Sequence, residues 1–139
     1  MNNRIPAEYS ATGTLLVSAF TAGGALPVPD ALVTVRFFDP ENSGVLTILY
    51  TDQSGNTPRI TLPAPPASAS EVPGNAVPYA KYIIEVDKEG FYPRSFSEVP
   101  VFANTTSIQP VNLMPISEYE GESVPPSGMN VTEGQNPNL

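Results

Sequence analysis

The stretch from Asp52 to Asn56, DQSGN, places an acid, a hydroxyl, an amide and a glycine side by side. Calcium loops use oxygen ligands of this kind, but they supply several carboxylates and close with a bidentate glutamate. Asp52 is the only acid in this stretch, so the pattern favours a turn over a cation site. We predict a hairpin turn in which Asp52 caps backbone donors and Gly55, beside Asn56, takes a positive φ.

A second candidate for chemistry is the pair of carboxylates at Glu85 and Asp87, with Glu89 following. Side chains two residues apart on a strand leave the same face, and paired carboxylates can act as general acid and base or hold a cation. The alternative is a solvated outer face with Lys81 and Lys88 nearby. We favour the solvated face and predict no catalytic residue, no metal site and no cofactor.

Histidine and cysteine are both absent from the 139 residues. Their absence excludes Ser-His-Asp and Cys-His nucleophiles, disulfides, and the usual nitrogen and sulfur ligands of zinc. Carboxylate chemistry and oxygen-ligated calcium need neither residue type, but neither the Asp52 to Asn56 stretch nor the pair of Glu85 and Asp87 favours them. We therefore predict that the chain is not an enzyme.

The charge balance restricts the class of partner. Fourteen acidic and six scattered basic residues give a net charge of −8, which disfavours nucleic acid and anionic lipid surfaces. The apolar runs are too short to span a bilayer, and the opening MNNRIPAEYS lacks the apolar stretch of a signal peptide. We expect synthesis in the cytoplasm without membrane insertion, and association with a spore, virion or cell surface only after release or assembly.

Apolar and polar residues alternate in short runs, which seventeen prolines and ten glycines interrupt. Proline disfavours long helices, so period-two alternation indicates strands. Two runs alternate most clearly, and we expect their inward side chains to form the core by facing one another across two layers. These side chains are Val33, Val35, Phe37, Tyr82, Ile84 and Val86.

Seven short runs separated by turn signals predict an all-β fold, an antiparallel seven-stranded Greek-key β-sandwich. The runs are Thr14–Phe20, Ala31–Phe38, Val45–Thr51, Pro58–Leu62, Tyr79–Asp87, Val99–Phe102 and Ser107–Ile116. The sandwich is expected to occupy residues 13–116, after an N-terminal lead of residues 1–12. Residues 117–139 form an acidic tail with proline and glycine, and we expect this tail to be flexible.

Four stretches carry a resemblance to known domains: GTLLVSAFTAGGALPVPDALVTV (13–35), TDQSGNT (51–57), PYAKYIIEVDKEGFYP (78–93) and VPVFANTTSIQPVNLMPI (99–116). Their order resembles the transthyretin-like, or carboxypeptidase regulatory-like, β-sandwich family. LPAPP, PY, GFYP and VFANTTSIQPVNLMP are most similar to the module of clostridial spore-cortex-lytic and peptidoglycan-binding proteins. The resemblance implies an accessory domain without catalysis of its own. The same fold hosts an enzyme that hydrolyses 5-hydroxyisourate with histidines, which this chain lacks.

Tyr79 and Tyr92 each lie close to a proline at the end of a predicted strand. Exposed aromatic rings stack on sugars, whereas aromatic residues at strand spacing otherwise belong to the core. We regard the two tyrosines as a candidate glycan platform.

We predict a structural or assembly module whose sheet edges and terminal arms contact either a partner protein or a second copy of the chain. The alternative is a glycan-binding accessory domain of cell-wall or spore-cortex machinery, with peptidoglycan as its partner.

Overall fold

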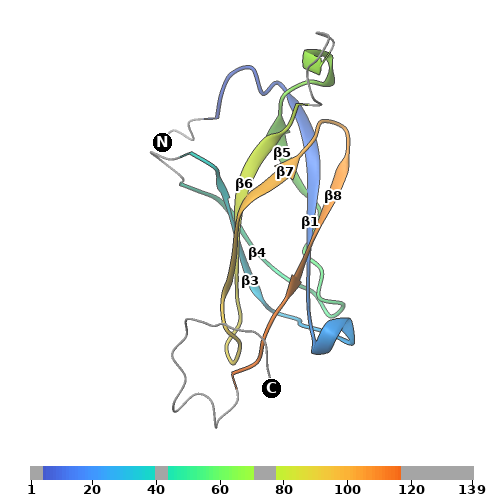
Figure 1. The fold of residues 1–139 in the computed structure, drawn as a ribbon, viewed down its shortest axis with the longest axis vertical. Helices are drawn as coiled ribbons and strands as arrows, with labels where there is room; N and C mark the ends of the chain where they lie inside the picture. Colours follow the sequence, from blue (N-terminus) through green and yellow to red (C-terminus); the bar gives the residue numbers. More distant parts are fainter. Residues whose placement is uncertain (1–4, 40–43, 71–77, 117–139) are drawn as a thin grey trace.

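The computed structural model describes residues 5–39, 44–70 and 78–116. In this part of the chain, eight strands form two sheets that pack face to face (Figure 1). The β1 sheet contains β1 (Ala11–Thr21), β2 (Leu26–Pro27), β5 (Ile60–Ala64) and β8 (Thr106–Asn112). The β3 sheet contains β3 (Leu32–Phe37), β4 (Val45–Tyr50), β6 (Ala80–Asp87) and β7 (Arg94–Val101). The predicted all-β sandwich is confirmed. Two short 3-10 turns, Ala22–Gly24 and Ala67–Ser70, complete the described elements.

The β3 sheet has the strand order β4-β3-β6-β7, with antiparallel pairing throughout. The six side chains expected in the core are all buried. However, they do not face one another across two layers as expected, because β3 and β6 pair directly within one sheet. The cross-strand pairs are Val33 with Val86, Val35 with Ile84, and Phe37 with Tyr82.

The layer opposite these six residues comes from the β1 sheet. Leu15 and Val17 of β1, Leu62 of β5 and Val111 of β8 are each at most 4% exposed and belong to the same hydrophobic cluster. β1 and β5 bury alternate positions, as the pleat of a β-strand requires, whereas β8 buries Val111 alone. The core therefore lies between the sheets, and the outer face of each sheet meets the solvent.

β1 is the central strand of its sheet. β5 pairs antiparallel with its first half, while β2 pairs antiparallel with its last two residues. β8 pairs with the opposite edge and runs parallel to β1, from Thr14 opposite Thr106 to Phe20 opposite Asn112. This parallel pair, visible as the two adjacent strands at one side of Figure 1, differs from the fully antiparallel prediction.

The parallel direction follows from the connection between β7 and β8. The connection crosses to the start of β1, where the Asn104 amide donates to the Thr12 carbonyl at 2.8 Å and the Thr14 amide donates to the Thr105 carbonyl at 2.9 Å. β8 therefore begins beside the start of β1 and continues in the same direction. Gly13 permits this close crossing, because a Cβ there would overlap the Phe102 carbonyl oxygen.

The strand count also differs from the prediction of seven. The additional strand, β2, has only two residues and lies in a glycine- and proline-rich segment from which no strand was expected. β7 begins at Arg94, five residues before the predicted short strand at Val99. β1 begins at Ala11, and the predicted tail, residues 117–139, lies outside the described residues.

Candidate functional site

The turn expected at Asp52 to Asn56 is held by its aspartate. The Asp52 carboxylate accepts the backbone amides of Ser54 at 2.9 Å and Asn56 at 3.0 Å. Gly55 has a φ of 83°, and a Cβ there would overlap the Ala19 carbonyl oxygen. The carboxylate is thus occupied by the turn itself.

This turn is not the hairpin that we expected. β4 and β5 lie on either side of it but belong to different sheets, so the chain crosses from one layer to the other here. The crossing is fixed against β1, because the Ala19 amide donates to the Gly55 carbonyl at 2.7 Å and the Thr57 amide donates to the Val17 carbonyl at 2.9 Å. Pairing with β1 replaces the pairing of β4 with β5.

The carboxylates at Glu85 and Asp87 lie on the outer face of the β3 sheet. Arg36 Nε donates to Glu85 Oε1 at 3.2 Å, and both side chains are partly exposed. Asp87 is exposed. Within residues 5–39, 44–70 and 78–116, no group of three or more acidic, histidine or cysteine side chains could hold a metal ion.

Tyr79 and Tyr92 do not come together. Tyr79 precedes β6, and Tyr92 follows the turn that connects β6 to β7. β6 and β7 pair antiparallel from Ala80 with Val101 to Val86 with Arg94, so the two tyrosines lie at opposite ends of this hairpin. At the usual rise of a strand they are roughly 30 Å apart. Tyr79 is 43% exposed and its ring packs against Phe102, with the centroids 5.4 Å apart.

The edges of the two sheets differ in how well they are protected. Proline, charge and irregular pairing are the usual devices that prevent an edge strand from accepting another strand. Among the described edge strands, all except β4 contain a proline. These prolines are Pro27 in β2, Pro63 in β5, Pro100 in β7 and Pro110 in β8.

β4 has the sequence VLTILY, without proline, glycine or charge. Side chains on its outer face are strongly exposed: Val45 by 47%, Ile48 by 55% and Tyr50 by 60%. Leu46 and Leu49 are partly buried against the core. A strand with apolar side chains on both faces is typical of the middle of a sheet, yet among the described strands β4 pairs with β3 alone. A bulge between β3 and β4 at Val35 and Arg36 is the one irregularity along their pairing.

The backbone of β4 is directed so that two residues face the free edge. The Thr51 amide donates to the Ala31 carbonyl at 3.1 Å, and hydrogen-bonded pairs alternate along an antiparallel ladder. The pair of Leu49 with Val33 is therefore hydrogen-bonded, whereas Ile48 and Tyr50 direct their amides and carbonyls away from β3. No described strand pairs with these groups.

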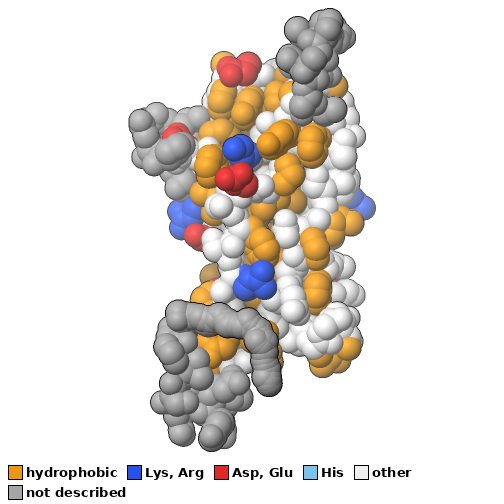
Figure 2. Space-filling view, in the orientation of Figure 1, with side chains coloured by type: hydrophobic (Ala, Val, Ile, Leu, Met, Phe, Trp, Pro, Cys, Tyr) orange, Lys and Arg blue, Asp and Glu red, His pale blue; other side chains and the backbone are white. Residues whose placement is uncertain are grey.

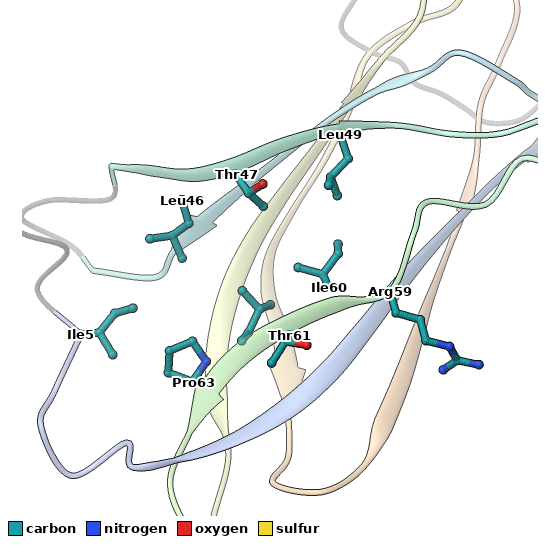
Figure 3. Close-up of a pocket in the computed structure, with 9 residues that line it drawn as sticks. Ile5, Leu46, Thr47, Leu49, Arg59, Ile60, Thr61 and Pro63 are labelled. Atoms are coloured by element: carbon teal, nitrogen blue, oxygen red, sulfur yellow. The ribbon is translucent and has the colours of Figure 1, made fainter.

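A groove of about 390 Å³ lies beside this edge, where the two sheets separate (Figure 3). Leu46 and Leu49 enter it from β4, Ile60 and Pro63 line it from β5, and Ile5 lies at its end. Arg59 points away from the groove in this view, so the interior is lined mainly by apolar side chains. We refer to β4 and this groove together as the open edge.

The opposite side of the sandwich is closed. Between the β6 to β7 turn and the segment after β8, the Tyr92 amide donates to the Met114 carbonyl at 2.9 Å, and the Ile116 amide donates to the Gly90 carbonyl at 2.8 Å. Arg94 of β7 also donates to the Asn112 carbonyl at 2.7 Å. The described strands contain no corresponding pairing of β4 with β5.

Figure 2 shows a face on which charged side chains are sparse and hydrophobic ones are spread among uncharged atoms. No helix in the described part of the chain is long and apolar enough to cross a membrane.

No family model and no curated protein matches this sequence. Solved structures match in fold. A catechol 1,2-dioxygenase from Acinetobacter sp. ADP1 has a TM-score of 0.53 and 14% identity, over 95% of this chain and 60% of the enzyme. The TIE protein of Bacillus anthracis has a TM-score of 0.49 and 11% identity, over 76% of this chain and 17% of that one. GBS52, a minor pilin of Streptococcus agalactiae, has a TM-score of 0.48 and 12% identity, over 77% of this chain and 46% of the pilin.

The chain spans less than two thirds of the length of each of these proteins. At such identities the likeness concerns the fold alone. The transthyretin-like resemblance stays a prediction, because no family model supports that name.

The prediction that the chain is not an enzyme was wrong. Several matched structures are 1,2-dioxygenases that act on catechol or 3-chlorocatechol, so enzymes contain sandwiches of this kind. The missing histidine and cysteine exclude particular nucleophiles and metal ligands, but the step from those exclusions to the absence of any catalysis does not stand.

Sequence reasoning missed the open edge. It identified β4 as a strand but expected that strand to pair with β5 in a hairpin. The available signal was the run VLTILY, in which large apolar residues outnumber the one threonine and do not alternate as in a strand with one solvated face.

Proposed function

We propose that this protein is an assembly module whose open edge accepts an extended segment from a protein partner. The observation that carries this proposal is the apolar, uncharged and proline-free strand β4, which has no described neighbour on its outer side. Exposed edges of this kind pair readily with added strands, and proteins use such strand addition to recognise peptides and to link subunits.

The backbone of β4 supports the proposal. Ile48 and Tyr50 offer their amides and carbonyls to an incoming strand, and the same two residues expose large side chains on the outer face. Main-chain hydrogen bonds supply affinity in strand addition, and the side chains at alternate positions supply specificity. Ile48 and Tyr50 therefore provide both the main-chain groups and the side chains for strand addition.

The groove beside β4 also supports the proposed strand addition. The inner side chains of a strand added beside β4 would cover the groove mouth and bury the exposed parts of Leu46, Leu49 and Pro63. Burial of apolar surface contributes about 25 cal/mol per Å², so closure of the groove favours the added strand.

The test is a selection of random heptapeptides, displayed on phage, against the immobilised protein. We expect enriched peptides with alternating apolar residues, and we expect Ile48→Pro to weaken their binding by about tenfold or more, or ~1.4 kcal/mol. Proline at position 48 removes an amide that faces the free edge, and it should leave the hydrogen bonds between β3 and β4 in place.

Ile48→Lys is a second variant that keeps the amide and adds a charge to the edge. The matched control is Ile108→Lys on β8, which is also exposed, by 63%, on an edge strand. Peptides that bind both Ile48 variants as tightly as the native protein would contradict the proposal.

The peptidoglycan alternative has no matching support in the described residues. It rested on the family resemblance, which no family model supports, and on Tyr79 and Tyr92 as a platform, and these two residues lie at opposite ends of the β6 to β7 hairpin.

A further inference from the structure

We propose that the partner at the open edge is a second copy of this chain, paired antiparallel through β4 about a two-fold axis. This inference rests on the proposed function and names its partner. The two β3 sheets would then join into one continuous sheet across the molecule pair. A two-fold contact of this type uses the same surface on both copies, so β4 must be complementary to itself.

The backbone of β4 satisfies this requirement in one register. The residues that face the free edge are Ile48 and Tyr50. If Ile48 lies opposite Tyr50 of the second copy, the two-fold axis generates a second, identical pair and passes between the two Leu49 residues. Both Ile48–Tyr50 pairs are then hydrogen-bonded. A shift by two residues in the direction of Leu46 would use the bulged part of the strand, whose backbone is irregular.

The side chains are also complementary in this register. On the outer face, Ile48 lies opposite Tyr50 of the second copy, and β-branched residues opposite aromatic ones are favourable cross-strand pairs. On the inner face, the two Leu49 side chains meet at the axis and extend the apolar lining of the groove. Residues with the same charge never lie opposite each other, because β4 has no charged residue.

Charge argues for self-association at this edge over other parts of the surface. Each chain has a net charge of −8, so two copies repel each other on average. Contact is least costly where both surfaces are neutral, and β4 is neutral along its whole length. Added salt screens the repulsion and should strengthen the dimer, whereas a basic partner would bind less tightly as salt increases.

Sedimentation equilibrium of the full chain, from about 1 µM to about 1 mM, tests whether the partner is a second copy. Contacts between edge strands are small, and such dimers dissociate in this concentration range. We expect a monomer–dimer equilibrium that tightens with salt. Ile48→Pro and Ile48→Lys should each raise the dimer dissociation constant at least tenfold, and Ile108→Lys should leave it within about twofold. Circular dichroism of each variant establishes that it remains folded.

Cysteine crosslinking tests the register, and the native chain contains no competing thiol. Leu49→Cys should form a disulfide-linked dimer under mild oxidation, because residues opposite each other at the axis lie within disulfide reach. Thr47→Cys is the matched control on the same inner face. In the proposed register the two Thr47 positions are roughly 13 Å apart, too far for a disulfide.

A chain that stays monomeric throughout, while displayed peptides still bind at Ile48, would overturn the second copy as partner and keep the proposed function. A monomer that binds no peptide would overturn both. A dimer that persists in both Ile48 variants would place the contact elsewhere and overturn the inference. Efficient crosslinking of Thr47→Cys but not Leu49→Cys would overturn the register.

Discussion

The hydroxyl of Tyr82 donates a hydrogen bond to the backbone carbonyl of Pro63, with 2.6 Å between the two oxygens. Tyr82 belongs to β6 and Pro63 to β5, so this bond joins the two sheets through the interior. The Tyr82 side chain is fully buried, and its ring packs edge-on against Phe37 with the centroids 5.6 Å apart. Pro63 also lines the groove, and the bond therefore fixes the position of β5 at the open edge.

Removal of this hydroxyl should destabilise the sandwich. Tyr82→Phe keeps the ring but leaves the Pro63 carbonyl without its donor, and we expect the free energy of unfolding to fall by about 1 to 2 kcal/mol. Urea denaturation followed by circular dichroism measures the change. Tyr79→Phe is the control, because Tyr79 is exposed and lies outside the open edge, and it should show almost no effect. Equal midpoints for Tyr82→Phe and the native chain would contradict this role.

The same tyrosine predicts a loss of stability at alkaline pH. Burial raises the pKa of Tyr82 above that of an unfolded tyrosine, which is about 10. The folded state thus retains the phenolic proton more tightly, so its contribution is fully present below pH 10 and is lost as pH rises through the folded pKa. Burial also raises the pKa of Tyr9, which acts in the same direction. Unfolding midpoints from pH 8 upward should fall more steeply for the native chain than for Tyr82→Phe.

Gly55→Ala should destabilise the crossover between the sheets. Position 55 combines a φ of 83° with direct overlap between a Cβ and the Ala19 carbonyl oxygen. Gly24 is the matched control, because its φ is 95° but nothing lies within 4 Å of a Cβ there. We expect Gly24→Ala to cost about 1 kcal/mol through backbone strain, and Gly55→Ala to cost at least about twice as much. Similar thermal midpoints for both variants would show that the overlap is relieved.

Thr51→Val should break a buried polar contact at the end of β4. The Thr51 hydroxyl accepts the Ala31 amide at 2.9 Å and donates to the Val28 carbonyl at 2.7 Å. Valine has nearly the same shape but leaves both backbone groups unsatisfied, so we expect a loss of about 2 kcal/mol or more in urea denaturation. Thr61→Val at an exposed position of β5 is the control and should change stability by less than about 0.5 kcal/mol.

The strands and the core could be predicted because alternation reports which face of a strand is buried. Val33, Val35 and Phe37 alternate with Thr34 and Arg36, and no other regular structure buries that set. Pairing partners could not be predicted in the same way. The positions Val33 and Val86 face inward whether their strands are neighbours or lie in opposite layers, so the pattern does not distinguish the two arrangements.

The crossover at Asp52 to Asn56 was missed for a related reason. A turn with aspartate and glycine is favourable both within a hairpin and between two sheets, because its hydrogen bonds are local. What decides between them is the docking of Gly55 and Thr57 onto β1, thirty or more residues earlier in the chain. The open edge was missed with it, since β4 is an edge strand only because β5 lies in the other sheet.

The parallel pairing of β1 and β8 determines how the domain responds to mechanical load. Tension applied to the start of β1 and the end of β8 pulls the two strands in opposite directions along their length, in shear. The seven paired positions from Thr14 with Thr106 to Phe20 with Asn112 then resist the pull together, where a hairpin pulled from its open end would unzip one bond after another. A chain of such domains joined end to end would therefore transmit force through the paired length of β1 and β8.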